Sequence, residues 1–298
     1  MRLEELRRFY AEEIRAVSNL QTEALARAFA RVRREDFLGP GPWQIATPDS
    51  WQSAAQSAAQ SAPAGYRTTP DADPRHLYHN VVVAIDAARR LNNGQPSALA
   101  SWFDALCLRG GERVAHVGCG VGYYTAVIAE TVGPRGSVIG IELDEGLAAR
   151  ARENLSGYAQ VEVVCADGGE YDFGERDAVF VNAGATHPRP LWLERLSDGG
   201  RLILPLTVAR GPDGGGGGLM LRVAREGGAY AARFVSTVSI FPCAGAREEG
   251  ANQRLREAFM RGDFEGVESL RRDAHEQADT CWLHGEGFCL SKLPASRA

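Results

Sequence analysis

Three glycines at alternate positions are the residues whose type and spacing point most clearly to chemistry in this chain. Gly118, Gly120 and Gly122 follow a short apolar run and precede a segment with helical periodicity. Glycine lets the backbone bend tightly and approach a ligand that a Cβ would exclude. A second apolar run, residues 137–142, ends in Glu142, whose carboxylate can accept hydrogen bonds from both hydroxyls of a ribose. The pattern predicts a nucleoside site at the first strand-to-helix turn.

The glycine spacing also discriminates between nucleoside ligands. Dinucleotide-binding loops read G-x-G-x-x-G, and their third glycine allows close packing of helix on strand. Here Tyr123 stands at that third position, and the glycine falls one residue earlier. The G-x-G-x-G form, with an acid at the end of the next strand, resembles the S-adenosyl-L-methionine site of class I methyltransferases. The plain alternative is a glycine-rich turn of an α/β protein that binds no ligand.

The segments around the glycine loop alternate between strand and helix patterns. This alternation predicts an α/β fold with a doubly wound, mostly parallel, Rossmann-like sheet covered on both faces. Two runs without a helix between them, residues 219–224 and 229–241, predict an antiparallel edge hairpin after a flexible connection at 214–218. The other expected strands are 113–117, 137–142, 161–165, 178–182 and 201–205, and the expected helices are 98–106, 123–132, 147–155 and 190–196.

We expect three consecutive segments in the chain. Residues 1–97 form an N-terminal helical cover and substrate loop, residues 98–244 the cofactor-binding core, and residues 245–298 a C-terminal extension packed on the core. Residues 39–75 include a low-complexity tract and are a poor candidate for a helix or strand. The extension is expected to contain helices at about 250–260 and 264–276 and a last strand at 281–290.

Composition narrows the function classes. A net charge of −5 argues against a broad nucleic-acid surface, and no apolar run reaches the roughly 18 residues of a membrane span. The N-terminal segment reads as an amphipathic helix rather than a secretion signal, and six scattered cysteines fit reduced thiols, so a cytoplasmic protein is expected. Cys281 and Cys289 flank His284, but their spacing matches no standard zinc pattern. Buried strand cysteines are the preferred interpretation, and no metal site is expected.

Several further segments together resemble protein-L-isoaspartate O-methyltransferases. The resemblance covers roughly residues 20–38 and 76–210. The matching segments are residues 28–37, 94–108, 167–168, 182–184 and 196–205, in the same order and spacing as in that family.

The resemblance implies a set of cofactor contacts. Glu142 would bind the ribose hydroxyls, Asp167 would take the adenine amino group, and Asn182 would lie close to the sulfonium. The full set that it implies is His116, Gly118, Gly120, Gly122, Tyr123, Glu142, Leu143, Asp167, Gly168 and Asn182.

The chain departs from this family at two places. His116 stands where the family has an acid that helps to hold the ammonium of the cofactor, and a hydrogen-bonded core histidine is the plain alternative. The family substrate loop reads T-I-S-[AQ]-P, whereas this chain reads Asn-Asn-Gly-Gln-Pro at residues 92–96. Gly94 therefore replaces the family serine, and Ser97 is shifted by three positions.

The acceptor that we expect is a carboxylate of a small molecule or peptide. A carboxylate is ionised at neutral pH and needs only orientation, which the amides of Asn92, Asn93 and Gln95 can provide. The same stretch is also a turn-forming sequence. A hydroxyl or amine acceptor would need a base, for which His79 and His187 are the candidates. The sequence also leaves open isoaspartate repair with Ser97 in place of the lost serine, and a non-catalytic cofactor-binding protein.

Overall fold

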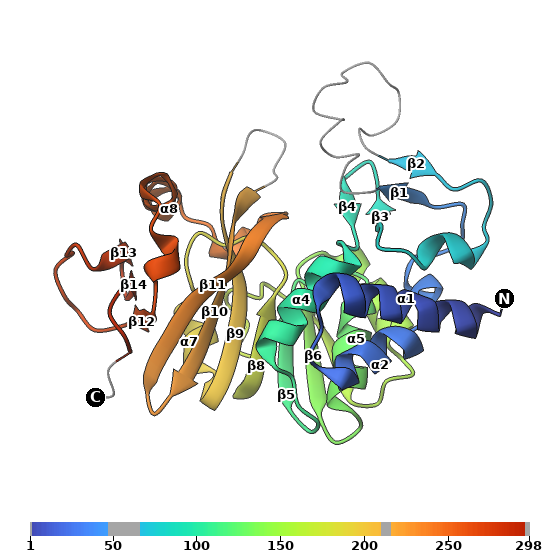
Figure 1. Cartoon of the computed structure of the whole chain (residues 1–298), viewed down its shortest axis with the longest axis horizontal. Helices are drawn as coiled ribbons and strands as arrows, with labels where there is room; N and C mark the ends of the chain where they lie inside the picture. Colours follow the sequence, from blue (N-terminus) through green and yellow to red (C-terminus); the bar gives the residue numbers. More distant parts are fainter. Residues whose placement is uncertain (1, 47–65, 210–215, 296–298) are drawn as a thin grey trace, which may run out of the picture. The chain divides into compact units, whose positions relative to one another are not determined.

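The structure is a computed structural model that describes residues 2–46, 66–209 and 216–295 (Figure 1). The chain forms two compact units that alternate along the sequence. The first unit comprises Met1–Gly110, Cys119–Arg135 and Asp144–Val161, and the second comprises Gly111–Gly118, Gly136–Leu143 and Glu162–Ala298. This division differs from the three consecutive segments that the sequence predicts, because strands of the second unit alternate in the sequence with helices of the first.

The first unit is built on helices. They are α1 (Leu3–Ser18), α2 (Glu23–Arg31), α4 (Pro96–Leu106), α5 (Tyr123–Val132) and α6 (Glu145–Asn154), with short 3₁₀ turns η1 (Arg34–Phe37) and η2 (Pro74–Leu77). Helix α5 is buried almost all round, as its mostly apolar sequence predicts, and Glu130 is its one residue that is not buried. Helix α1 instead buries one face, through Tyr10, Ala11 and Ile14.

A small antiparallel sheet belongs to the same unit. Its strand order is β2-β1-β3-β4, from β1 (Gln44–Ala46), β2 (Arg67–Thr68), β3 (Val82–Asp86) and β4 (Leu91–Asn92). Strands β1 and β2 lie inside residues 39–75, so part of that segment forms strands where none was expected. Its low-complexity tract, at residues 53–62, lies outside the described residues.

The second unit is a mixed sheet in the order β13-β14-β12-β11-β10-β9-β8-β5-β6-β7 (Figure 1). Strands β9, β8, β5 and β6 pair in parallel, and β9 through β14 pair antiparallel. This agrees with the expected mostly parallel core with an antiparallel edge. The strands are β5 (Arg113–Val117), β6 (Ser137–Glu142), β7 (Val161–Cys165), β8 (Arg176–Val181), β9 (Leu196–Ala209), β10 (Gly216–Glu226), β11 (Ala229–Ile240), β12 (Ser269–Arg271), β13 (Cys281–Gly285) and β14 (Phe288–Ser291).

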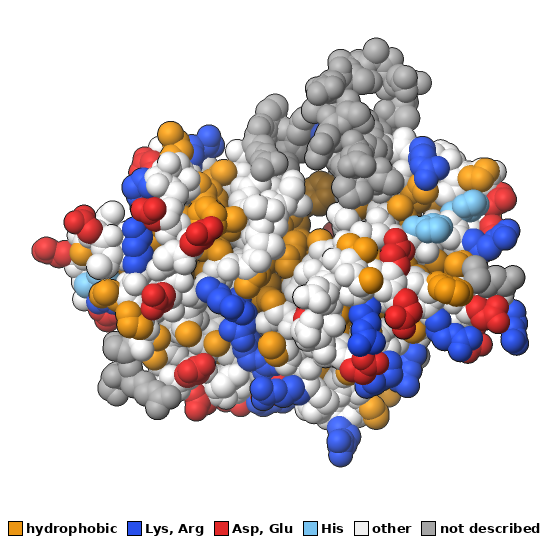
Figure 2. All heavy atoms as spheres, viewed as in Figure 1, with side chains coloured by type: hydrophobic (Ala, Val, Ile, Leu, Met, Phe, Trp, Pro, Cys, Tyr) orange, Lys and Arg blue, Asp and Glu red, His pale blue; other side chains and the backbone are white. Residues whose placement is uncertain are grey.

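Short helices complete the second unit: α7 (Pro190–Glu194), η3 (Ala244–Ala246), α8 (Glu249–Arg261) and η4 (Phe264–Gly266). The central strands β5 and β8 are nearly continuous apolar runs, as strands buried on both faces require. On the face shown in Figure 2, basic and acidic side chains are interspersed. Among the residues that the structure describes, no helix is long and apolar enough to cross a membrane.

The C-terminal extension corrects part of the sequence prediction. Residues 264–276 form no α-helix, and only the 3₁₀ turn η4 lies within them. Gly262 and Asp263 have positive φ and end α8, and Leu270 then pairs with Leu290 of β14. Tertiary strand pairing here overrides a helical pattern. The expected strand at 281–290 is a hairpin, β13 and β14, and the expected strand at 201–205 is the middle of the longer β9. Residues 216–218 of the expected flexible connection begin β10, whereas residues 214 and 215 lie outside the described residues.

Candidate functional site

The carboxyl ends of β5 and β8 meet at residues 117, 118 and 182 of the second unit. The Asn182 amide donates to the Val117 carbonyl at 2.8 Å, and Asn182 Nδ2 lies 3.4 Å from the Gly118 carbonyl. A Cβ on Gly118, which has φ +76°, would lie 3.4 Å from the Asn182 carbonyl oxygen. Glycine therefore allows these two strand ends to approach closely. We call the carboxyl ends of β5, β6, β7 and β8 the nucleoside edge, since ligands of open α/β sheets bind there.

The neighbouring strand β6 ends in Glu142, as the sequence predicts. The Glu142 side chain is half-buried, and the next residue, Leu143, is 53% exposed. An apolar side chain exposed beside a carboxylate at this edge suits a ligand with a flat base and a hydroxylated sugar.

Asp167 follows β7 and closes the nucleoside edge on its far side. One of its carboxylate oxygens, Oδ1, accepts from the Gly169 amide at 2.8 Å. Gly168 has no room for a side chain, because a Cβ there would lie 2.4 Å from Val117 Cγ1. Its carbonyl accepts from Trp192 Nε1 at 2.7 Å, which holds this turn against α7. The second carboxylate oxygen can accept a hydrogen bond from an amino group.

The glycine loop continues along the chain into the first unit, where its last two glycines have different roles. Gly122 has φ +92° and begins α5, and a Cβ on it would lie 2.7 Å from Leu155 Cδ1. Gly120 has φ +57°, and a Cβ on it would meet nothing within 4 Å. Gly122 is therefore needed for packing, whereas Gly120 leaves open space beside the backbone. This is the cradle that a ligand lying over the loop requires.

Tyr123 corrects one of the sequence predictions. Its ring is 1% exposed and makes edge contacts with Phe37 and Tyr124, at centroid distances of 5.7 and 4.8 Å. The Arg34 guanidinium lies 5.8 Å from the ring centroid, and burial raises the pKa of the Tyr123 phenol well above its usual value. The side chain belongs to the core of the first unit and not to a ligand-facing surface. Its neighbour in α5, Tyr124, is also buried.

His116 lies in the interior of β5, with its ring 5.3 Å from that of Phe180 on β8. The residue is fully buried, and this burial lowers its pKa to about 3. The imidazole is therefore neutral near pH 7. A neutral ring without exposed surface cannot replace the charge of the family acid, and a contact of His116 with the cofactor stays a prediction.

The polar groups of the nucleoside edge fit the nucleoside part of S-adenosyl-L-methionine. Glu142 and Asp167 offer acceptors for a ribose and an adenine amino group, and Asn182 offers an amide at the end of β8.

The residues predicted to orient the substrate lie in the first unit. Asn92 Oδ1 accepts from the Gly94 amide at 2.9 Å, and Gly94 has φ +72°, so the predicted turn is confirmed. Asn93 is 7% exposed, and its Oδ1 accepts from the Val83 amide at 2.9 Å. Asn93 thus ties the turn to β3, and its buried Nδ2 meets no partner among the described residues.

Asn80, which the sequence reasoning did not single out, holds the side chain of Ser97. Its Oδ1 accepts from the Ser97 amide at 3.0 Å, and its Nδ2 donates to Ser97 Oγ at 2.9 Å. Gln95 Nε2 lies 3.3 Å from the same hydroxyl, at the N-cap of α4. A serine could not simply replace Gly94, because φ is +72° and a Cβ would lie 2.9 Å from Leu99 Cδ2. The hydroxyl of this loop is therefore that of Ser97, held by two amides.

The two histidines considered as bases have different surroundings. His79 is exposed, and its carbonyl accepts from Arg34 Nη1 at 3.2 Å. His187 is 9% exposed, with Nδ1 3.0 Å from Thr186 Oγ1 and its ring stacked on Phe288 of β14 at 6.0 Å. Burial lowers the pKa of His187. A role of either histidine as a base stays a prediction.

Comparison with known proteins agrees with this geometry. The family model described as protein-L-isoaspartate(D-aspartate) O-methyltransferase matches residues 69–213. A protein-L-isoaspartate O-methyltransferase 2 of an Anaeromyxobacter species is 32% identical over 213 residues, which cover 70% of this chain and 71% of that protein. The chain belongs to the protein-L-isoaspartate O-methyltransferase family. It is therefore a methyltransferase that uses S-adenosyl-L-methionine as its cofactor.

Other relatives and structures give the extent of the likeness. Protein-L-isoaspartate O-methyltransferase 1 of Archaeoglobus fulgidus is 38% identical over 146 residues, which cover 45% of this chain and 67% of that protein. The match to the Thermotoga maritima relative is 28% identical and covers 63% of this chain and 51% of that protein. A Plasmodium falciparum structure of the family, in complex with S-adenosyl-L-homocysteine, has a TM-score of 0.59 at 16% identity and covers 80% of this chain and 98% of that chain. The fold is thus that of the family over most of the chain.

Proposed function

We propose that this protein methylates a carboxylate of a peptide or protein, of the isoaspartyl kind for which its relatives are named. The names of those relatives favour a protein acceptor over the small-molecule acceptor considered from the sequence. S-Adenosyl-L-methionine supplies a methyl group activated by its sulfonium. The chain has to hold the acceptor carboxylate in line with the bond between the methyl group and the sulfur. Such positioning can lower the activation free energy by up to about 7–11 kcal/mol.

The observation that carries the proposal is the hydroxyl of Ser97. Asn80 and Gln95 both donate to its oxygen, so its own proton is available to a carboxylate. A carboxylate with a pKa near 4 is already ionised at neutral pH, and no general base is required. A hydroxyl fixed by two amides can therefore donate a hydrogen bond to such an acceptor and orient it.

The test uses two peptides that differ only in one linkage, isoaspartyl or aspartyl. With labelled S-adenosyl-L-methionine, we expect transfer to the isoaspartyl peptide, and the label should be released as methanol by mild base, as for a methyl ester. Ser97→Ala should lower kcat at least tenfold and leave the affinity for the cofactor unchanged. Ser156→Ala, an exposed serine whose hydroxyl donates to the Glu153 carbonyl, is the matched control. Base-stable product, or equal turnover of the two peptides, would reject the proposal.

A further inference from the structure

Two histidines and two cysteines of the C-terminal extension meet away from the nucleoside edge. One donor atom from each of His275, Cys281, His284 and Cys289 lies within 4.8 Å of the other three. Cys281 Sγ and His275 Nε2 are 3.6 Å apart. With Zn–S near 2.3 Å and Zn–N near 2.0 Å, neighbouring ligands of a tetrahedral zinc ion are about 3.3–3.8 Å apart. The sulfur and nitrogen already have the separation of two ligands of one ion.

The hairpin of β13 and β14 explains how three of these residues reach one face. His284 pairs directly with Cys289, so their side chains share a face. Strict alternation along β13 would put Cys281 on the opposite face from His284. The register shift between Cys281 and Leu283 instead brings Cys281 opposite Ser291, on the face of Cys289. A bulge that redirects one side chain is typical of a functional position in a sheet.

The fourth residue, His275, comes from the segment between β12 and β13 and is oriented by Asp273. His275 Nδ1 lies 2.9 Å from the Asp273 carbonyl oxygen and 3.3 Å from Asp273 Oδ2. A hydrogen bond from Nδ1 to oxygen fixes the tautomer that leaves Nε2 as a ligand atom. In this cluster that Nε2 faces Cys281 Sγ.

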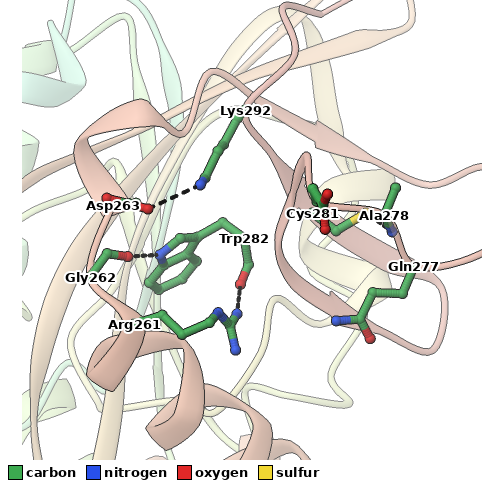
Figure 3. A pocket seen from close by; sticks show the side chains of 9 residues that line it. Arg261, Gly262, Asp263, Gln277, Ala278, Cys281, Trp282 and Lys292 are labelled. Atoms are coloured by element: carbon green, nitrogen blue, oxygen red, sulfur yellow. Dashed lines mark hydrogen bonds and ion pairs between the residues drawn. The ribbon is translucent and has the colours of Figure 1, made fainter.

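Burial and hydrogen bonding of the cluster also fit a metal site. Cys281 and Cys289 are free thiols that are 6% and 0% exposed. The Ala278 amide lies 3.4 Å from Cys281 Sγ, and Figure 3 shows the two residues side by side at the edge of a pocket that Trp282 also lines. His284 Nδ1 is buried and has no hydrogen-bond partner among the residues that the structure describes. A buried nitrogen without a partner is costly unless a ligand satisfies it.

We propose that His275, Cys281, His284 and Cys289 form a structural zinc site. Two thiolates and two imidazoles in a tetrahedral set select zinc, and four protein ligands leave no open position for catalysis. Binding of the divalent ion displaces the two thiol protons to solvent, without a change of oxidation state. The site then carries no net charge, and Asp273, which orients His275, forms an ion pair with Arg271. The ion would tie the segment before β13 to the last hairpin.

Metal content of the full chain is the first test. Protein produced with zinc in the medium and dialysed under reducing conditions should retain about one zinc ion per chain by mass spectrometry. Cys281→Ser, Cys289→Ser and their combination should lose most of that zinc. Cys107→Ser, which changes an exposed cysteine outside the cluster, should retain it.

A cobalt titration of the wild-type chain keeps the test valid if the variants fail to fold. Co(II) should give the intense visible bands of a tetrahedral site and a thiolate charge-transfer band, both removed by added zinc. Chelation of the zinc should lower the unfolding temperature of the wild type and leave that of the double cysteine variant unchanged. Wild-type protein without zinc and without these bands would overturn the proposal. Zinc retained by the double variant, or a Cys281–Cys289 disulfide in protein isolated under non-reducing conditions, would overturn it as well.

Discussion

Ser97 and Asn80 are joined by two reciprocal hydrogen bonds, from the Ser97 amide to Asn80 Oδ1 at 3.0 Å and from Asn80 Nδ2 to Ser97 Oγ at 2.9 Å. The pair connects the residues that follow η2 to the first turn of α4. It fixes the position of the hydroxyl proposed to orient the acceptor, although Asn80 itself belongs to no recognisable motif.

Asn80→Ala should affect both stability and turnover. Loss of the side chain leaves the Ser97 amide without its acceptor, which costs about 1–3 kcal/mol in the free energy of unfolding, measured with urea. With the hydroxyl released, kcat for the isoaspartyl peptide should fall while cofactor affinity is kept. Gln253→Ala, which removes an exposed amide on α8, is the matched control. An unchanged kcat in Asn80→Ala would show that the pair of Asn80 and Ser97 has no role in the reaction.

Glu142→Ala should weaken cofactor binding. Removal of an acceptor that holds two ribose hydroxyls is expected to raise the Kd for S-adenosyl-L-methionine about 10- to 100-fold, measured by calorimetry. Glu145→Ala removes an exposed acid in the first turn of α6 and should leave the Kd unchanged. If Glu142→Ala and the wild type bind S-adenosyl-L-methionine with equal affinity, Glu142 does not bind the ribose.

The last two loop glycines should respond differently to alanine. Gly122→Ala combines φ +92° with a contact of 2.7 Å to Leu155 Cδ1, so it should cost about 1–2 kcal/mol more stability than Gly120→Ala. Gly120→Ala should mainly raise the Kd for the cofactor, because its Cβ enters open space. Unfolding in urea of both variants, repeated in a Leu155→Ala background, measures the contact directly. A stability difference that persists without the Leu155 side chain would exclude it as the cause.

Burial of His116 predicts acid sensitivity. Its pKa falls from about 6.5 in the unfolded chain to about 3 in the native state. Between these values the unfolded chain binds a proton that the native chain does not. The contribution of His116 to the free energy of unfolding is therefore fully present above pH 6.5. It decreases by about 1.4 kcal/mol per pH unit as the pH falls towards 3.

The measurement is the difference between the free energies of unfolding at pH 6.5 and pH 5. This difference should be about 2 kcal/mol smaller in His116→Leu than in wild type. The comparison cancels the carboxylates, which titrate in both proteins. An equal difference in the two proteins would mean that the imidazole is not buried neutral. Weaker binding of the cofactor by the same variant would support His116 as a cofactor residue.

Local patterns predicted the parts of the fold and site in which neighbouring residues decide the structure. The strand, glycine turn and helix at residues 113–132 follow from apolar runs and three glycines, and the Asn92–Gly94 turn follows from residue type. Glu142 was placed correctly at a strand end because strand length and alternation are local properties.

Features set by long-range contacts were missed. The hydrogen bond between Asn80 and Ser97 depends on how two segments of the chain meet, and no residue spacing predicts it. Tyr123 was expected to face a ligand, but the fold supplies Phe37 and Tyr124 as ring partners and buries it. A metal site at Cys281, His284 and Cys289 was set aside because their spacing matches no standard zinc pattern. The approach of His275 and the bulge at Cys281 cannot be derived from that spacing.

Strand β9 connects two halves of the large sheet, and we expect these halves to assemble at different rates. Its residues 201–203 pair in parallel with β8 and antiparallel with β10. Strands β9, β10 and β11 pair in chain order, whereas Val114 of β5 meets Ala178 of β8 only after two other strands have intervened. Because closing long loops costs more entropy and slows pairing, the meander should protect its amides from hydrogen exchange first during refolding. The nucleoside edge should then be completed late, and we expect the cofactor to accelerate only the last steps of refolding.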